Sequence, residues 1–172
     1  ATPFRMDQKD IFSFCDDNVI YEVGLREAIG RDLLVPFRYY GIYDDTDYSV
    51  IGYSGGRYNA SQLERALMTG NRASLVLDKY LQFRGSRAMG FCSTIRQARY
   101  MAEHFRKNGI RAEAVYSQPD EGDMDRGQAL RELAEGRLEI IFTVDLFNEG
   151  VDVPSLDTVL FLRPTESHTV FL

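Results

Sequence analysis

The residues best suited to chemistry stand between two apolar runs near the end of the sequence. Residues 140–144 and 158–162 are rich in β-branched and aromatic side chains, a composition that favours strands covered on both faces. Gly150 and Pro154 interrupt the segment between them. Hydroxyl, amide and carboxylate side chains begin where the first run ends: Thr143, Asp145, Asn148, Glu149 and Asp152. Ligands of open α/β sheets bind beyond the carboxyl ends of the strands, so these groups are the first candidates for a binding site.

A second pair of hydroxyl groups follows the alternating run over residues 87–92. Ser93 and Thr94 stand between that run and a predicted helix over 95–108. Hydroxyl groups at such a junction cap the helix and can also donate hydrogen bonds to a phosphate. Arg96 and Arg99 on the same helix are the cations expected to assist a phosphate contact.

Strands and helices alternate along the second half of the chain. The pattern predicts strands at 87–92, 111–116, 138–144 and 156–162, and helices at 95–108 and 124–135. Earlier segments predict helices at 25–29, 61–69 and 72–83 and a strand at 35–42. Such alternation requires right-handed crossovers between parallel strands. The sequence therefore predicts an α/β fold, a three-layer parallel sheet with helices on both faces.

Length and composition bound the class of protein. The chain has 172 residues and a hydrophobic share of 44%, which suit one globular domain with a sizeable core. No stretch approaches the roughly 18 apolar residues of a membrane span. The net charge of −6 argues against a wholly basic nucleic-acid module but leaves room for a local phosphate track. The two cysteines, Cys15 and Cys92, lack metal-ligand spacing, and a reduced, cytoplasmic setting is expected.

Three other segments contain residues typical of metal or phosphate sites, and each has a simpler interpretation. The acidic run at 43–48 lacks the spacing of a calcium loop and is interpreted as a solvated loop, so no metal site is predicted. The glycine-rich run at 52–57 is followed by no Gly-Lys-Ser/Thr and is interpreted as a turn rather than a P-loop. Residues 120–123 follow Pro119 in a turn, not an apolar strand, and are not an acidic metal box.

Residues 143–154, Thr-Val-Asp-Leu-Phe-Asn-Glu-Gly-Val-Asp-Val-Pro, resemble motif V of superfamily 2 helicases. In that family the motif lies in the second of two RecA-like domains, which have the P-loop NTPase type of fold. The resemblance implies that Thr143 contacts the nucleic-acid backbone and that Gly150 and Asp152 line the ATP cleft. By residues alone, the same segment is a strand-to-loop turn.

Further segments resemble the same family in the expected order. Residues 88–94 and the helix after them resemble motif IV, which implies nucleic-acid contacts for Ser93 and Thr94. Ser117 occupies the next strand end, where the family again contacts nucleic acid. The first three residues resemble the tail of motif III, and residues 161–172 resemble the lead into motif VI. The resemblance implies a linker at 1–34 from a preceding helicase domain and a C-terminal RecA-like domain at 35–172, cut before motif VI.

The resemblance is strongest to DEAD/DEAH-like helicases of the type III restriction-subunit group. It implies a complete enzyme that uses ATP and Mg²⁺, binds nucleic acid, with DNA favoured over RNA, and pairs this domain with an N-terminal RecA-like domain of the same chain. The isolated chain has no Walker A loop, Walker B or motif VI, and we expect it to be inactive alone. Two alternatives remain at this stage: a non-catalytic interaction module on a RecA-like fold, and a flavodoxin-like regulatory domain, for which no acidic phosphoacceptor pocket is evident.

Overall fold

The computed structural model describes residues 21–55, 57–120, 123–144, 153 and 155–163. The chain divides into two compact units, Ala1–Tyr43 with Thr165–Leu172, and Asp44–Pro164. Among the described residues, no helix is long and apolar enough to cross a membrane.

The described part of the first unit contains one short helix. The helix α1 (Leu25–Gly30) buries Ala28, and Arg31 pairs with Glu27 at 2.6 Å just after it. Residues 35–42, predicted to be a strand, form no strand, and their apolar side chains are largely exposed. The prediction was wrong because an apolar run becomes a strand only when a neighbouring strand satisfies its backbone groups. Within the described part of the chain these residues have no such partner.

The second unit begins with a hairpin and two helices. The segment contains the 3₁₀ turn η2 (Tyr48–Val50), the antiparallel strands β1 (Tyr53–Ser54) and β2 (Arg57–Tyr58), and the helices α2 (Ala60–Leu67) and α3 (Gly70–Phe83). The turn predicted at 52–57 is this hairpin, and Gly55 has the positive φ of 59° that a tight turn requires. Asn59 and Thr69 cap α2 and α3 by accepting hydrogen bonds from the backbone N–H groups three residues on.

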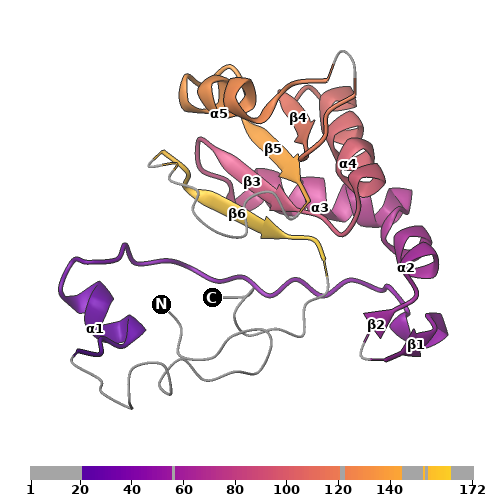
Figure 1. The fold of residues 1–172 in the computed structure, drawn as a ribbon, viewed down its shortest axis with the longest axis horizontal. Helices are drawn as coiled ribbons and strands as arrows, with labels where there is room; N and C mark the ends of the chain where they lie inside the picture. Colours follow the sequence, from indigo (N-terminus) through magenta and orange to yellow (C-terminus); the bar gives the residue numbers. More distant parts are fainter. Residues whose placement is uncertain (1–20, 56, 121–122, 145–152, 154, 164–172) are drawn as a thin grey trace. The chain divides into compact units, whose positions relative to one another are not determined.

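The rest of the second unit is a four-stranded parallel sheet with its helices. The elements are β3 (Ala88–Phe91), α4 (Ile95–Lys107), β4 (Ala112–Val115), α5 (Arg126–Ala134), β5 (Ile140–Thr143) and β6 (Thr158–Phe161). The strand order is β4-β5-β3-β6, and all neighbouring strands are parallel (Figure 1). Each strand and helix predicted after residue 60 is present, with ends shifted by a few residues. The predicted α/β class with a parallel sheet is therefore confirmed.

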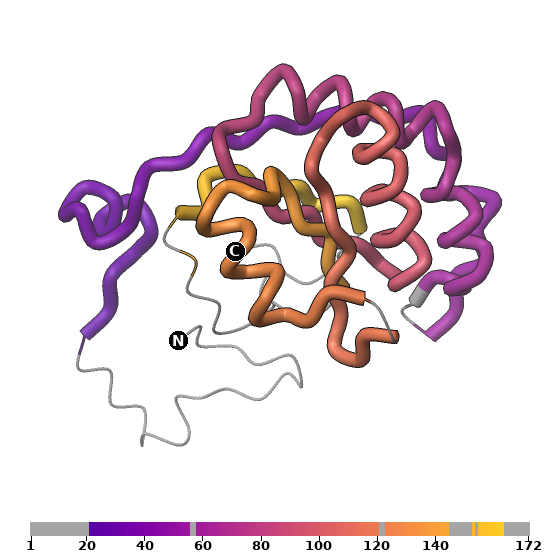
Figure 2. Tube along the Cα trace, turned by 90° about the horizontal axis from the view of Figure 1, so that it is seen from above, coloured from indigo at the N-terminus to yellow at the C-terminus, as the bar shows by residue number. Residues whose placement is uncertain are grey.

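The crossovers explain why helices cover both faces. From β3 to β4 the chain passes over β5, and from β4 to β5 it moves back in the opposite direction. Crossovers of one hand then place α4 and α5 on opposite faces of the sheet. Figure 2 shows α3 in magenta and α5 in orange on opposite sides of the strands.

Successive side chains along the strands pack into two separate hydrophobic cores, one on each face of the sheet. On one face Ile140 and Phe142 pack with buried residues of α3 and α4, among them Met101 and Phe105. On the other face Ile141 packs against α5. Because successive side chains of a strand point to opposite faces, the continuous apolar run that identified β5 in the sequence supplies both cores.

Candidate nucleic-acid interface

The carboxyl ends of three neighbouring strands stand level with one another. In the sheet register, Thr143 at the end of β5 is paired with Phe91 at the end of β3 and with Val115 at the end of β4. Ser93 lies two residues after Phe91, and Ser117 lies two residues after Val115. Residues far apart in the sequence thus come to one edge of one sheet. We call the four predicted residues at this edge the hydroxyl row: Ser93, Thr94, Ser117 and Thr143.

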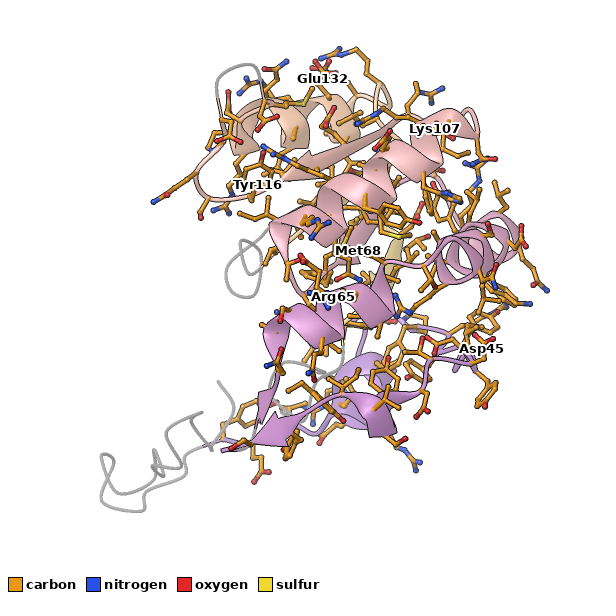
Figure 3. All side chains as sticks on the ribbon, turned by 90° about the vertical axis from the view of Figure 1, so that its right-hand side faces the viewer. Asp45, Arg65, Met68, Lys107, Tyr116 and Glu132 are labelled. Atoms are coloured by element: carbon orange, nitrogen blue, oxygen red, sulfur yellow. The ribbon has the colours of Figure 1, made fainter. Side chains whose placement is uncertain are left out.

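Thr94 acts first as a helix cap. Its Oγ1 accepts a hydrogen bond from the backbone N–H of Gln97 at 3.1 Å, as expected for the N-cap of α4. The same hydroxyl donates to the Glu64 carboxylate at 2.7 Å, and Glu64 also pairs with Arg96 at 3.2 Å. Glu64 lies on α2, which carries the labelled Arg65 in Figure 3 and ends just before the labelled Met68. Helix α2 is therefore joined to the hydroxyl row, although sequence patterns gave no indication of this.

Two hydroxyl groups of the row are buried and have no hydrogen-bond partner in the part of the chain that the structure describes. The side chain of Thr143 is fully buried, and its Oγ1 has no hydrogen-bond partner among the described residues. The Oγ atom of Ser93 is likewise buried without a partner in the same part of the chain. Buried polar groups are nearly always hydrogen-bonded, so these two hydroxyl groups require a partner that the described residues do not supply.

Ser117 is exposed and follows a cluster of charged side chains. The Tyr116 hydroxyl donates to the Asp123 carboxylate, and the Arg99 guanidinium lies over the Tyr116 ring and pairs with Asp120 and Asp123. Burial, followed by the bond to Asp123, raises the pKa of Tyr116, while the Tyr116 hydrogen bond lowers the pKa of Asp123. Tyr116, labelled in Figure 3, follows β4, so this cluster ties the Ser117 turn to α4.

The two arginines expected to assist phosphate contacts both have acidic partners. Arg99 is paired with Asp120 and Asp123, and Arg96 is paired with Glu64. The row therefore carries less unpaired positive charge than the sequence suggested. A phosphate would compete with these carboxylates for the two guanidinium groups.

A buried polar network links the row to the end of β6. The Leu162 carbonyl accepts hydrogen bonds from Gln97 Nε2 and Arg72 Nη2, both at 3.3 Å. Gln97 Oε1 accepts from the backbone N–H of Ser93 at 2.8 Å. Arg72 Nε pairs with Asp44 at 3.0 Å. Gln97 and Arg72 thus connect Ser93, β6 and the start of this unit.

Sequence reasoning missed Gln97 and Arg72. A signal existed for Gln97, because it stands four and eight residues before Met101 and Phe105 on the buried face of α4. A polar residue within an apolar stripe requires a buried partner. The burial of Arg72 follows from tertiary packing and leaves no comparable pattern in the sequence.

The residues predicted to line an ATP cleft, Gly150 and Asp152, lie outside the described residues, as do Asp145, Asn148 and Glu149. Within the ranges that the structure describes, no group of three or more His, Cys, Asp or Glu side chains could hold a metal ion. Burial raises the pKa of the Cys92 thiol to about 12, so Cys92 is a neutral core residue at neutral pH.

These features define a parallel α/β domain whose strand ends bring hydroxyl groups to one edge. The family follows from comparison with known proteins: the model of the helicase conserved C-terminal domain matches residues 72–172, and the chain belongs to this family. The predicted helicase C-terminal domain is thereby confirmed. The segment from Asp44 to Asn71, including the hairpin and α2, lies outside the matched range.

Curated relatives include a 51.5 kDa protein of a Lactococcus phage (isolate 7-9), 27% identical over 172 residues, which cover all of this chain and 37% of that protein. The putative ATP-dependent helicase IRC3 of Saccharomyces cerevisiae is 22% identical over 176 residues, covering all of this chain and 25% of its own length. The UvrABC system protein B of Chlorobium limicola is 34% identical over 79 residues, 46% of this chain and 11% of that protein. The chain thus spans little more than a third of these relatives at most.

Solved structures with a similar fold include the C-terminal domain of the DEAD-box protein Dbp5, with a TM-score of 0.49 and 15% identity over 60% of this chain and 59% of that one. The Hef helicase domain of Pyrococcus furiosus has a TM-score of 0.44 and 22% identity over 60% of this chain and 22% of that one.

Proposed function

We propose that this chain is the second RecA-like domain of an ATP-dependent nucleic-acid helicase or translocase, in which the hydroxyl row contacts the nucleic-acid backbone. The observation that carries the proposal is the row itself. The segment that resembles motif IV contains Phe91, the segment that resembles motif V begins at Thr143, and these two residues are paired in the sheet. Membership of the helicase C-terminal family supports the same function.

The proposal fits the chemistry of the row. Hydroxyl groups donate hydrogen bonds to phosphate oxygens without reading base edges, which positions a strand without selecting a sequence. The buried Oγ atoms of Ser93 and Thr143 have no partner among the residues that the structure describes, and a phosphate that reached them would satisfy both donors. The exposed Ser117 extends the row at its far end. DNA is the preferred polymer in this proposal, because the motif resemblance is strongest to the restriction-subunit group.

Nucleotide use is the second part of the proposal. Gly150 and Asp152 would face ATP between this domain and an N-terminal RecA-like domain, and a carboxylate with a nearby backbone N–H suits the ribose hydroxyls. ATP with Mg²⁺ would supply the free energy that drives stepping along the strand. Since this chain lacks a P-loop sequence, we propose that it has no ATPase activity by itself and acts within a cytoplasmic, complete enzyme.

Replacing Thr143 with valine tests the row. Valine keeps the β-branched shape and removes only the hydroxyl, so nucleic-acid binding by the complete protein should weaken by roughly fivefold, the equivalent of about one hydrogen bond. The loss should be the same for every sequence, since backbone contacts do not specify bases. Titration of labelled single-stranded DNA and RNA measures both effects.

The folding stability of Thr143→Val and two variants at neighbouring exposed positions provide the controls. Because Oγ1 of Thr143 has no partner among the described residues, valine should leave the free energy of unfolding unchanged or slightly higher. Ser117→Ala should also weaken binding, whereas Gln118→Ala, at the exposed neighbouring position, should not. Equal affinity of the wild type, Thr143→Val and Ser117→Ala would remove the row from the nucleic-acid path.

Glu64 should oppose nucleic-acid binding, because its carboxylate faces Thr94 and neutralises Arg96. Glu64→Gln keeps an oxygen that can accept from Thr94 but releases the positive charge of Arg96. Affinity should rise about threefold at low salt, and the slope of log K against log salt should steepen by about one unit, as for one added phosphate contact.

Glu103→Gln is the matched control. Glu103 pairs with Lys107 on α4, and it lies farther from the N-terminus of that helix than Arg96 does. It makes the same change in net charge at a distance from the row. If both variants altered affinity and salt slope equally, the effect would come from net charge alone and Glu64 would have no local role.

A further inference from the structure

The side chain of Gln97 is fully buried at the start of α4, where it contacts the chain beyond two different strands. Its amide oxygen Oε1 accepts a hydrogen bond from the backbone N–H of Ser93 at 2.8 Å. Its amide nitrogen Nε2 donates to the carbonyl of Leu162 at 3.3 Å. Ser93 follows β3 and Leu162 follows β6, so one side chain joins the segments that leave two neighbouring strands.

The bond to Ser93 differs from the usual cap of a helix. Thr94 and Gln97 have the spacing of a capping box, and the Thr94 hydroxyl accepts from the Gln97 N–H as that motif requires. In a capping box the glutamine side chain accepts from the backbone N–H of the cap residue, which here is Thr94. The Gln97 oxygen instead accepts from Ser93, one residue earlier in the chain. Neither this bond nor the bond to Leu162 is needed to cap α4.

Contacts on two sides hold the backbone of Ser93. The preceding residue, Cys92, donates its backbone N–H to the Thr143 carbonyl at 2.8 Å, which ties it to β5. On the other side Gln97 joins Ser93 to the end of β6. A side chain on a fixed backbone has three staggered positions about its first torsion. The place of the Ser93 hydroxyl relative to that of Thr143 therefore depends on Gln97.

The Leu162 carbonyl, to which Gln97 is bound, is held by a second buried donor. Arg72 Nη2 donates to this carbonyl at 3.3 Å, and Arg72 Nε pairs with the Asp44 carboxylate at 3.0 Å. Two donors on one carbonyl oppose its movement away from either of them. Gln97 thus connects Ser93 to a fixed point of the fold.

We propose that Gln97 is the residue that positions Ser93 for the nucleic-acid backbone; the inference rests on the proposed function. Its complete burial keeps it from contacting the strand, so it acts through the Ser93 N–H. The position needs a side chain that accepts a hydrogen bond at one atom and donates at another, and an amide does both. Because the amide is uncharged, it affects the geometry of the hydroxyl row and not the attraction of the row for phosphate.

The test is a double-mutant cycle on the nucleic-acid affinity of the complete protein. Gln97→Met keeps the length of the side chain and removes both amide hydrogen bonds. In titrations with labelled single-stranded DNA, Gln97→Met and Ser93→Ala should each weaken binding about fivefold, the equivalent of one lost hydrogen bond. The double variant should bind no more weakly than Ser93→Ala alone, since residues that act through one contact are not additive. The slope of log K against log salt should not change, because no charge is altered.

Amide hydrogen exchange gives a second measurement. In Gln97→Met the Ser93 N–H loses its acceptor and should exchange faster, whereas the Cys92 N–H, bonded to the Thr143 carbonyl, should keep its protection. If Gln97→Met does not fold, Gln97→Asn replaces it in both measurements, because its amide is one methylene shorter and does not span both partners.

Two controls separate positioning from stability. Gln128→Met makes the same chemical change at an exposed position of α5 and should leave affinity unchanged. Leu133→Ala opens the core on the opposite face from Phe142 and should lower the urea midpoint without weakening binding by the folded protein.

The other outcomes overturn the proposal in distinguishable ways. If Thr143→Val and Ser93→Ala weaken binding but folded Gln97→Met does not, the hydroxyl row stands and Gln97 has only a structural role. If the losses of Gln97→Met and Ser93→Ala add in the double variant, Gln97 does not act through Ser93. If the wild type binds no oligonucleotide, or no variant of the row weakens binding, both the proposed function and this inference fail.

Discussion

Replacing Arg72 with methionine is expected to lower the free energy of unfolding by about 3 kcal/mol. Breaking a buried ion pair by removing one partner typically costs about 3 to 5 kcal/mol, and the lower value applies because the Asp44 side chain keeps 19% of its surface exposed. The variant also removes one of the two side-chain donors to the Leu162 carbonyl. Urea unfolding of the chain followed by circular dichroism measures the loss.

The pH dependence of this loss has a defined sign. Burial raises the pKa of Asp44, but hydrogen bonds from Thr46 and the Arg72 guanidinium outweigh it and hold the pKa below its ordinary value. The ion pair therefore stabilises the fold above the ordinary carboxyl pKa and is lost as the pH falls through the lowered one. The difference in stability between the wild type and Arg72→Met should shrink as the solution is acidified.

Two further variants separate charge from packing. Arg72→Lys keeps the charge, but a single ammonium group lacks the fork that reaches both Asp44 and Leu162, so its loss should be intermediate. Arg72→Met combined with Asp44→Asn removes both charges and should be less destabilising than Arg72→Met alone. If the double variant were as unstable as the sum of two independent losses, the uncompensated carboxylate would not be the cause.

Replacing Gly90 with alanine is expected to cost about 3 kcal/mol, the upper end of the usual cost of overpacking. A Cβ atom at this position would stand 2.6 Å from Cδ1 of Phe142, far inside van der Waals contact. The Phe142 ring has no room to retreat, because it is fully buried and packed edge to face against Phe105 at 4.9 Å. The measurement is again equilibrium unfolding.

A second substitution tests the cause of this loss. Phe142→Leu shortens the side chain that the new methyl group would meet, so the double variant with Gly90→Ala should be at least about 1 kcal/mol more stable than additivity predicts. Gly70→Ala is the matched control, because a Cβ there meets nothing within 4 Å, and alanine at a helix start should be neutral or slightly stabilising. If the stability changes of Gly90→Ala and Phe142→Leu were strictly additive in the double variant, the predicted contact between the two side chains would be contradicted.

The fold class was predictable because its signals are local. The apolar run of β5, the helical spacing of Met101 and Phe105 in α4, and the cap residue Thr94 each depend on neighbours within a few residues. When strands and helices alternate in this way, the strands are parallel and the crossovers that connect them are right-handed. The motif residues were likewise visible, since Ser93, Thr94 and Thr143 stand where strands end in the sequence.

Non-local pairing decided the rest. Nothing in the sequence places β3 between β5 and β6, because strand order depends on which distant runs meet. That order sets Thr143 level with the ends of β3 and β4 and so assembles the row. The same dependence explains why the apolar run at 35–42 is no strand, since β propensity produces a strand only where a neighbouring strand pairs with it.

The polar interactions needed the tertiary structure most. Arg72 is an ordinary charged residue in the sequence, and only the packing of α3 beside Asp44 and the end of β6 makes it a buried donor. Arg99 was expected to be a cation for phosphate, and the fold gives it two carboxylates from a turn more than twenty residues away. The sequence by itself determined which elements form and which side chains they bear. The tertiary structure decided which of those side chains meet, because charge pairing and burial depend on distance in space.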